Sequence, residues 1–189
     1  MRAKHSLPEN KKLIVIGATK LNDPVKGFKY LRQALSILAK KRDDLFLIMF
    51  GDIKNAPSFL SDMPIEYRSM GLMSDPSLIA QLYAAADMTV VSSMYETFGQ
   101  TLIESMACGC PGVSFNNSGQ TDIIEHKVNG YLAAYKDAED LAAGIVWVLD
   151  NTERLHLPEA CIEKVQTNYT ESIVANKYIA LYTELLAKQ

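Results

Sequence analysis

Short apolar runs alternate with longer amphipathic segments along the chain. The first run, at residues 13–18, reads LIVIGA. Further runs lie at residues 44–50, 65–70, 88–91, 113–115 and 131–133, of which 65–70 is the weakest. Short segments that are apolar at nearly every position are typical of strands buried on both faces of a parallel sheet. The pattern therefore predicts about six strands.

Between these strands, apolar residues recur at helical spacing. Phe28, Leu31 and Leu38 belong to one such stripe. Gly109 and Pro111 form a stop signal, because glycine adopts the left-handed conformation that ends a helix and proline prevents its continuation. The predicted helices lie at residues 28–38, from 74–76 onward, and at 98–108, 121–125, 137–149 and 172–186.

This alternation implies right-handed crossovers between parallel strands. We therefore expect an α/β fold with a Rossmann-like, open parallel sheet of about six strands and helices on both faces. The 189 residues suit one domain, which we assign to residues 11–189. Residues 1–10 are polar and are predicted to be a linker or tether to a part outside this sequence.

Composition narrows the possible partners. Apolar residues make up 48% and charged residues 22%, which excludes a disordered chain. The net charge is −3, from 19 Lys and Arg against 22 Asp and Glu, so the chain lacks the basic excess that nucleic-acid binding requires. A local basic pocket that binds a small phosphate ligand remains compatible with this net charge.

No apolar run approaches the length of a membrane span, and the first residues lack the apolar core of a signal peptide. We expect a cytoplasmic chain. Cys108, Cys110 and Cys161 are odd in number and lack zinc-ligand spacing, so they are predicted to be free, buried thiols. No metal site is assigned.

Ligands of open α/β sheets bind at the carboxyl ends of the strands, so the loops after residues 18, 50, 70, 92 and 115 are the informative ones. No G-x-G-x-x-G follows the first strand, and G-x-x-x-x-G-K-[ST] is absent. The sequence thus carries neither a dinucleotide fingerprint nor a Walker A loop.

The densest polar segment is YETFGQTLIESMACGCP at residues 95–111, which passes from a strand end into a helix. Gly99 allows the backbone to approach a ligand closely. The amides of Gln100, Thr101 and Leu102 at the start of the helix are expected to be free and to form an anion site. A phosphate group suits that position.

Two glutamates flank this site, Glu96 in the loop and Glu104 in the helix. A carboxylate can accept hydrogen bonds from two neighbouring hydroxyls, as in a ribose or another sugar diol. On spacing alone, solvated or helix-capping carboxylates are the alternative interpretation.

The same segment resembles the E-x7-E region of retaining, GT-B-fold glycosyltransferases of family four, the glycosyl transferases group 1. That pattern is close to E-x-F-G-x-x-x-x-E-A-x-A-x-G-x-P, and here it runs from Glu96 to Pro111 with Ser105 in place of the common alanine. The likeness extends from about Leu13 to the end of the chain. It covers only the carboxyl-terminal, donor-binding lobe of such an enzyme.

The resemblance implies roles for individual residues. Glu104 would hold the ribose hydroxyls, and Glu96 a hydroxyl of the donor sugar. Lys26, in the Lys26-Gly27 match before the first helix, would hold the diphosphate together with the amides of Thr101 and Leu102. Glu96 and Lys26 are thus the expected catalytic residues.

Two further matches complete the expected donor site. The backbone near Gly71 and Leu72 would meet the base, and Gly119 lies in a segment that looks like the family's glycine-rich turn. One departure concerns the first loop, where many relatives carry an arginine and this chain has none. Lys20 or a cation from the absent lobe is the candidate replacement, and weaker phosphate binding is the other outcome.

The resemblance implies transfer of a sugar from a nucleotide diphosphate sugar to an acceptor, with retention, without a metal or other cofactor, in polysaccharide or glycoconjugate synthesis. The implied partners are the donor and an amino-terminal acceptor domain. Membrane contact would be peripheral, at the inner face, through that absent domain. A GT-B nucleotide-sugar epimerase and a non-catalytic nucleotide-binding or interaction module remain as alternatives.

Overall fold

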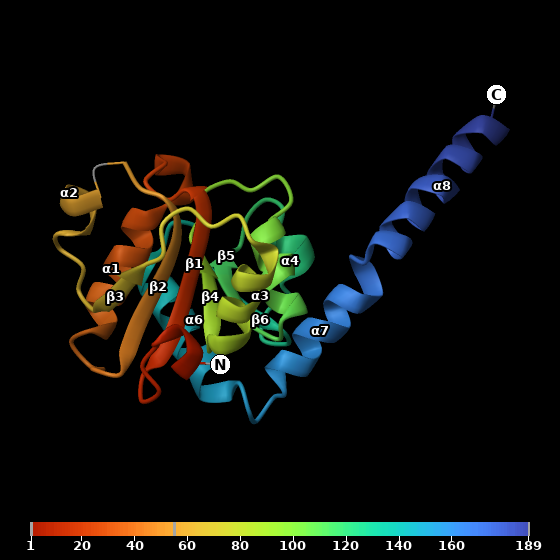
Figure 1. Cartoon of the computed structure of the whole chain (residues 1–189). Coiled ribbons are helices and arrows are strands. Elements are labelled where there is room, and N and C mark those ends of the chain that lie inside the picture. Colours follow the sequence, from red (N-terminus) through yellow and green to blue (C-terminus); the bar gives the residue numbers. More distant parts are fainter. Residues whose placement is uncertain (1, 55, 189) are drawn as a thin grey trace.

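The computed structural model describes residues 2–54 and 56–188. Within them six strands form one sheet in the order β3-β2-β1-β4-β5-β6, and every neighbouring pair is parallel. Figure 1 shows the sheet between two layers of helices, with α8 projecting from the body. The predicted Rossmann-like architecture is confirmed.

The strands are β1 (Lys12–Lys20), β2 (Leu45–Asp52), β3 (Glu66–Ser69), β4 (Met88–Val91), β5 (Gly112–Phe115) and β6 (Gly130–Ala133). The α-helices are α1 (Phe28–Leu38), α2 (Ala56–Leu60), α3 (Pro76–Ala85), α4 (Gln100–Ala107), α5 (Gln120–Ile123), α6 (Ala138–Asn151), α7 (Leu157–Asn168) and α8 (Glu171–Ala187). Short 3-10 helices η1 (Ala3–His5) and η2 (Pro24–Lys26) precede β1 and α1.

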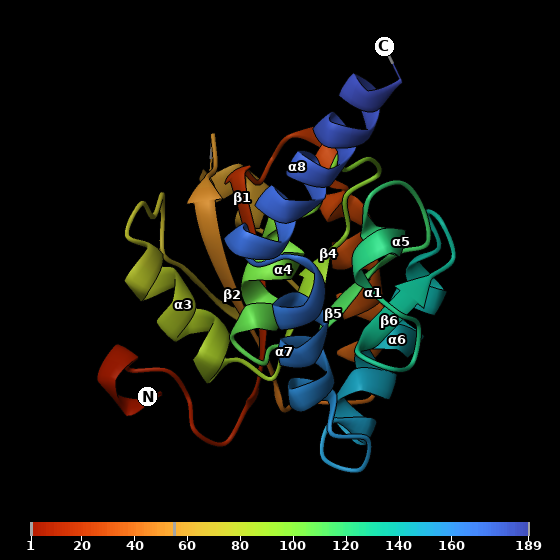
Figure 2. The same ribbon diagram turned by 90° about the vertical axis from the view of Figure 1, so that its right-hand side faces the viewer.

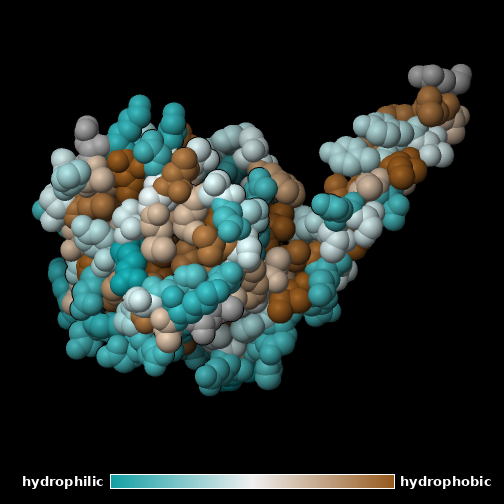
Figure 3. Space-filling view, in the orientation of Figure 1, coloured by the Kyte–Doolittle hydropathy of each residue, from teal (hydrophilic) through white to brown (hydrophobic). Residues whose placement is uncertain are grey.

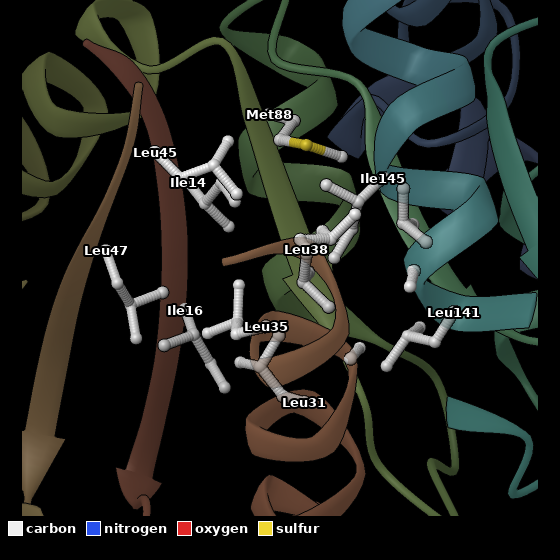
Figure 4. Close-up of a cluster of buried hydrophobic side chains, with 14 of the residues drawn as sticks. Ile14, Ile16, Leu31, Leu35, Leu38, Leu45, Leu47, Met88, Leu141 and Ile145 are labelled. Carbon is white, nitrogen blue, oxygen red and sulfur yellow. The ribbon is translucent and has the colours of Figure 1, made fainter. Parts of the chain in front are cut away.

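Both faces of the sheet are buried, which explains why the central strands are apolar at successive positions. Ile14 and Ile16 of β1 point toward α1 and α6, where Leu35 and Ile145 join the same core (Figure 4). Leu13 and its neighbours on the opposite face of β1 pack with α3. Adjacent strand residues therefore alternate between two cores, as period-two geometry requires.

Local signals set the helix ends that the sequence predicts. The Asp75 carboxylate accepts a hydrogen bond from the Ser77 amide at 2.8 Å and caps α3, with Pro76 in its first turn. Gly109 follows α4 with φ +71°, the left-handed conformation expected for the residue that ends a helix.

Two helices were not predicted. α2 is only five residues long, and α7 has little net hydrophobicity because polar residues surround a narrow buried stripe. Leu157, Cys161 and Val165 form that stripe at intervals of four, and Pro158 lies in the first turn. The spacing and the proline are the signals that identify α7.

Residues 2–10, which belong to the segment expected to be a tether, pack against the domain, while Met1 of that segment lies outside the described residues. The Arg2 guanidinium forms an ion pair with Asp87 at 2.7 Å and donates to the carbonyl of Ala85 at 2.9 Å. Leu7 is buried beside the core between the sheet and α3. This segment is thus part of the folded body, and its connection to a further domain stays a prediction.

The predicted helix at residues 172–186 is confirmed as α8, and none of its residues 171–187 is buried. Figure 2 shows it rising away from α7, and hydrophobic side chains lie along its surface in Figure 3. The large exposed apolar residues of this helix are Tyr178, Ile179, Leu181, Tyr182, Leu185 and Leu186. None of the helices formed by residues 2–54 and 56–188 is both long enough and apolar enough to cross a membrane.

Candidate functional site

The candidate site lies where the strand order reverses. β1 is the first strand in the chain, and its neighbours in the sheet are β2 on one side and β4 on the other. Loops that leave two such adjacent strands diverge and open a crevice at their carboxyl ends. The β1 loop carries Lys26, and the β4 loop carries Glu96 and leads into α4.

Lys26 and Glu96 meet at this end of the sheet. The Lys26 ammonium donates to Glu96 Oε1 at 2.7 Å, and the Ser93 hydroxyl donates to the same oxygen at 2.7 Å. The two side chains are 31% and 16% exposed, so the pair is partly accessible to solvent. An ammonium has three protons, and this contact leaves two for another acceptor.

The backbone of the Lys26 loop is fixed against the β4 loop. The Ser92 hydroxyl donates to the Lys26 carbonyl at 3.0 Å, and the Met94 amide donates to the Val25 carbonyl at 2.8 Å. Gly27 has φ +63°, and a Cβ there would lie 2.0 Å from the Ser92 carbonyl oxygen. The glycine therefore permits the close approach that brings Lys26 to Glu96.

The start of α4 is open to an anion. Its N-cap Gly99 has φ +81° and supplies no side-chain cap. Within the described part of the chain, the amides of Gln100 and Thr101 have no hydrogen-bond acceptor. Together with the helix dipole, these donors favour a negatively charged group.

Leu102 corrects the expectation of a free amide. Its N–H donates to the Gly99 carbonyl at 2.9 Å, which closes the first turn of α4, and its side chain is fully buried. An anion site at α4 would therefore use the amides of Gln100 and Thr101, whereas Leu102 is a core residue.

Glu104 lies on the side of α4 that is near α3. Burial raises the pKa of its carboxyl, against the opposing effect of a hydrogen bond from Gln100, and Tyr83 of α3 lies near enough to be influenced by its charge. Glu96 instead contacts Lys26 and Ser93. The two glutamates thus belong to separate clusters.

The predicted base-binding segment is exposed. Gly71 has φ +68°, and its carbonyl accepts from the Gly51 amide at 2.7 Å, which ties it to the end of β2. Leu72 is 70% exposed, an unusual state for a large apolar side chain. The backbone at these residues is accessible for contact with a flat ligand.

Lys20 is at the end of β1 rather than in the following loop, because β1 extends two residues beyond the predicted end at residue 18. Its side chain is exposed, and within residues 2–54 and 56–188 it forms no ion pair. Whether it replaces the missing arginine stays a prediction.

Gly119 contacts the Glu96 loop directly. Its amide donates to the Glu96 carbonyl at 3.0 Å, and a Cβ at this position would lie 2.8 Å from the Thr97 carbonyl oxygen. Ser118 and Gln120, on either side, bond to the same loop. Sequence reasoning missed Ser93 and Ser118 as site residues, although polar residues directly after two apolar strands were a usable signal.

A cavity of about 190 Å³ lies beside this site, lined by residues that include Asp23, Pro24 and Met94. A hollow of about 550 Å³ lies between α1 and α2, lined by residues that include Phe28, Arg32 and Phe59. Across the described residues, no group of three or more His, Cys, Asp or Glu side chains is arranged to hold a metal ion. All three cysteines are free; Cys110 and Cys161 are buried as predicted, whereas Cys108 is only partly buried.

The sheet order and the site at the switch point define one Rossmann-like half of a GT-B glycosyltransferase fold. The chain belongs to the family described as "Glycosyl transferases group 1", which matches residues 1–167. A D-inositol 3-phosphate glycosyltransferase of Thermobispora bispora is 32% identical over 138 residues, covering 70% of this chain and 32% of that protein.

Solved structures share the fold of this chain. A glycosyltransferase from Rickettsia africae superposes with a TM-score of 0.82 at 26% identity, over 100% of this chain and 51% of that one. Anabaena Alr3699/HepE, solved in complex with UDP and glucose, shares the fold with a TM-score of 0.77 at 24% identity, over 100% of this chain and 51% of its own. The chain thus spans about a third to a half of the length of these relatives.

Proposed function

We propose that this chain is the donor-binding part of a retaining glycosyltransferase that transfers a sugar from a nucleotide diphosphate sugar to an acceptor. The observation that carries the proposal is the arrangement of Lys26, Glu96 and the open first turn of α4 at one switch point. Family membership supports the reaction class. The particular sugar, base and acceptor are left open.

In the proposed mechanism, catalysis consists of stabilising the negative charge that develops on the departing diphosphate. The two remaining protons of Lys26 and the amides of Gln100 and Thr101 would bind its oxygens. Donors held in place before the reaction need no reorganisation as charge develops. Glu96 would accept a hydrogen bond from a hydroxyl of the donor sugar, and Glu104 would accept hydrogen bonds from the ribose diol. None of these contacts requires a metal.

The acceptor is assigned to a second lobe. Relatives about two to three times as long as the matched region support this division. The exposed apolar face of α8 also supports it, because a contiguous apolar patch on a helix is typical of a surface that another domain covers. Closure of two lobes around the donor would exclude water from the reacting atoms.

Calorimetry with UDP, GDP and ADP tests the proposal. We expect the wild-type chain to bind at least one of them, and Glu104→Ala to bind it about tenfold more weakly or worse. Hydrogen bonds to a charged group contribute on the order of 1.5–3 kcal/mol, which corresponds to a loss of this size. UDP is the first candidate, since it is the nucleotide in the Anabaena structure.

Glu163→Ala is the matched control. Glu163 is an exposed glutamate on α7, outside the proposed site, and its removal should leave the affinity unchanged. The proposal is wrong if the wild type binds none of the three diphosphates, or if Glu104→Ala and Glu163→Ala bind as tightly as the wild type.

A further inference from the structure

Gln120 is a fully buried polar side chain at the edge of the candidate site. It is the first residue of α5, and a long amide is costly to bury there unless its polar atoms find partners. Both of them do, because Nε2 donates to the Ser93 carbonyl at 3.1 Å and Oε1 accepts from the Ser118 hydroxyl at 2.7 Å. Because the side chain is inaccessible, it cannot contact a donor itself.

Both partners of Gln120 hold Glu96. The Ser118 hydroxyl accepts from the Glu96 amide at 3.1 Å, and the Ser93 hydroxyl donates to Glu96 Oε1 at 2.7 Å. One side chain therefore reaches Glu96 by two routes, through its backbone and through its carboxylate. The same carboxylate oxygen accepts the bond from Lys26.

The backbone conformation of Ser118 indicates that this hydrogen-bond network has a functional role. Its φ is +48°, a left-handed conformation that residues other than glycine seldom adopt. Glycine would occupy this conformation without strain but has no hydroxyl to link Gln120 to the Glu96 amide. Strained residues of this kind cluster at functional sites, where the surrounding contacts maintain them.

We propose that Gln120 is a positioning residue, which holds Glu96 in the geometry that pairs it with Lys26 by way of Ser93 and Ser118. This role rests on the proposed function, in which Glu96 meets the donor sugar. It assigns Gln120 to the alignment of the site and not to contact with the substrate.

A double-mutant cycle between Lys26→Met and Glu96→Gln tests the proposal without any ligand. Urea unfolding of the four proteins gives the coupling between the two side chains. In the wild-type background we expect coupling of about fivefold in the unfolding equilibrium constant, the upper end for ion pairs near the surface. In a Gln120→Met background, which keeps side-chain length but removes the polar atoms, the coupling should fall to nearly onefold.

Two further variants separate positioning from a general loss of stability. Thr89→Val removes a buried hydrogen bond from Thr89 to the Val15 carbonyl in the middle of the sheet, and should lower stability while the coupling stays at the wild-type value. Ser118→Gly relieves the backbone strain and removes the hydroxyl, so it should fold well yet weaken the coupling. It serves as the background for the cycle if Gln120→Met does not fold.

Unchanged coupling in the Gln120→Met or Ser118→Gly background would overturn the positioning role, as would equal loss of coupling in the Thr89→Val background. Since no nucleotide is present, such a result leaves the donor-binding proposal to its own calorimetric test. Conversely, failure to bind any nucleoside diphosphate would remove the functional meaning of the alignment without altering the measured coupling.

Discussion

At the scale of single residues, the site depends on side chains that are fixed by hydrogen bonds and still have hydrogen-bond donors free for a ligand. The Lys26–Glu96 pair is 70 positions apart in sequence, and Ser93 reinforces it from the Glu96 side. A bare ion pair near the surface contributes at most about 1 kcal/mol. Its value here is geometric, because the pair fixes the ammonium of Lys26 beside Glu96 and leaves two of its protons for another acceptor.

Glu104 provides a prediction on pH dependence. Partial burial raises the pKa of its carboxyl above its usual value, so the folded chain binds this proton more tightly than the unfolded chain does. The free energy of unfolding therefore decreases as pH rises from the unfolded pKa through the folded pKa. Glu104→Gln removes this loss, and thermal unfolding should show it gaining stability relative to the wild type between pH 4 and pH 7.

The effect on melting temperature should be small, since Glu104 remains accessible to solvent. A variant that instead lost stability relative to the wild type as the pH rose would show that the Glu104 carboxylate is stabilised by the fold. The account of its environment between α4 and α3 would then be incorrect.

At the scale of elements, α7 and α8 show how similar helices differ in what they contribute. α7 packs its stripe of Leu157, Cys161 and Val165 into the domain, whereas α8 exposes its apolar face. This difference in burial cannot be predicted from the two helix sequences, because it depends on which neighbouring elements each helix packs against. The structure confirms the helix predicted at residues 172–186, whereas α7 was not predicted because its buried stripe is narrow.

Alanine substitutions on these two helices should separate their contributions. Leu157→Ala removes a fully buried side chain and should lower the free energy of unfolding by about 2–5 kcal/mol. Leu186→Ala on α8, where the side chain is 70% exposed, should change it by less than about 0.5 kcal/mol. Urea unfolding checks both values, and a large loss from Leu186→Ala would mean that α8 is covered within the isolated chain.

At the scale of the whole molecule, the alternation of strands and helices was sufficient to predict the parallel sheet. Crossover handedness and the burial of both faces leave few arrangements for such a sequence. The contact between Lys26 and Glu96 follows from β1 lying beside β4. The packing of Arg2 and Leu7 against the body was not predictable, because polar composition does not reveal an ion pair with a residue 85 positions away.

The sequence predicted which residues belong to the candidate site more fully than it predicted their hydrogen bonds. The motif identified Glu96, Glu104 and Gly99, but the Leu102 amide is used within α4 and the two glutamates face different clusters. Such details depend on helix phase and on hydrogen bonds of the first turn. The buried links through Ser93, Ser118 and Gln120 also required coordinates, since two separate loops and the start of α5 contribute to them.

The central claim is that a diphosphate binds at the open first turn of α4. Titration of the isotopically labelled chain with UDP, GDP or ADP, observed through its backbone amide NMR signals, tests it most directly. The account predicts that the Gln100 and Thr101 amides shift most strongly, together with residues around Lys26. The account would be contradicted if the nucleotide shifted the signals of residues that line the hollow between α1 and α2 and left the Gln100 and Thr101 amide signals unchanged.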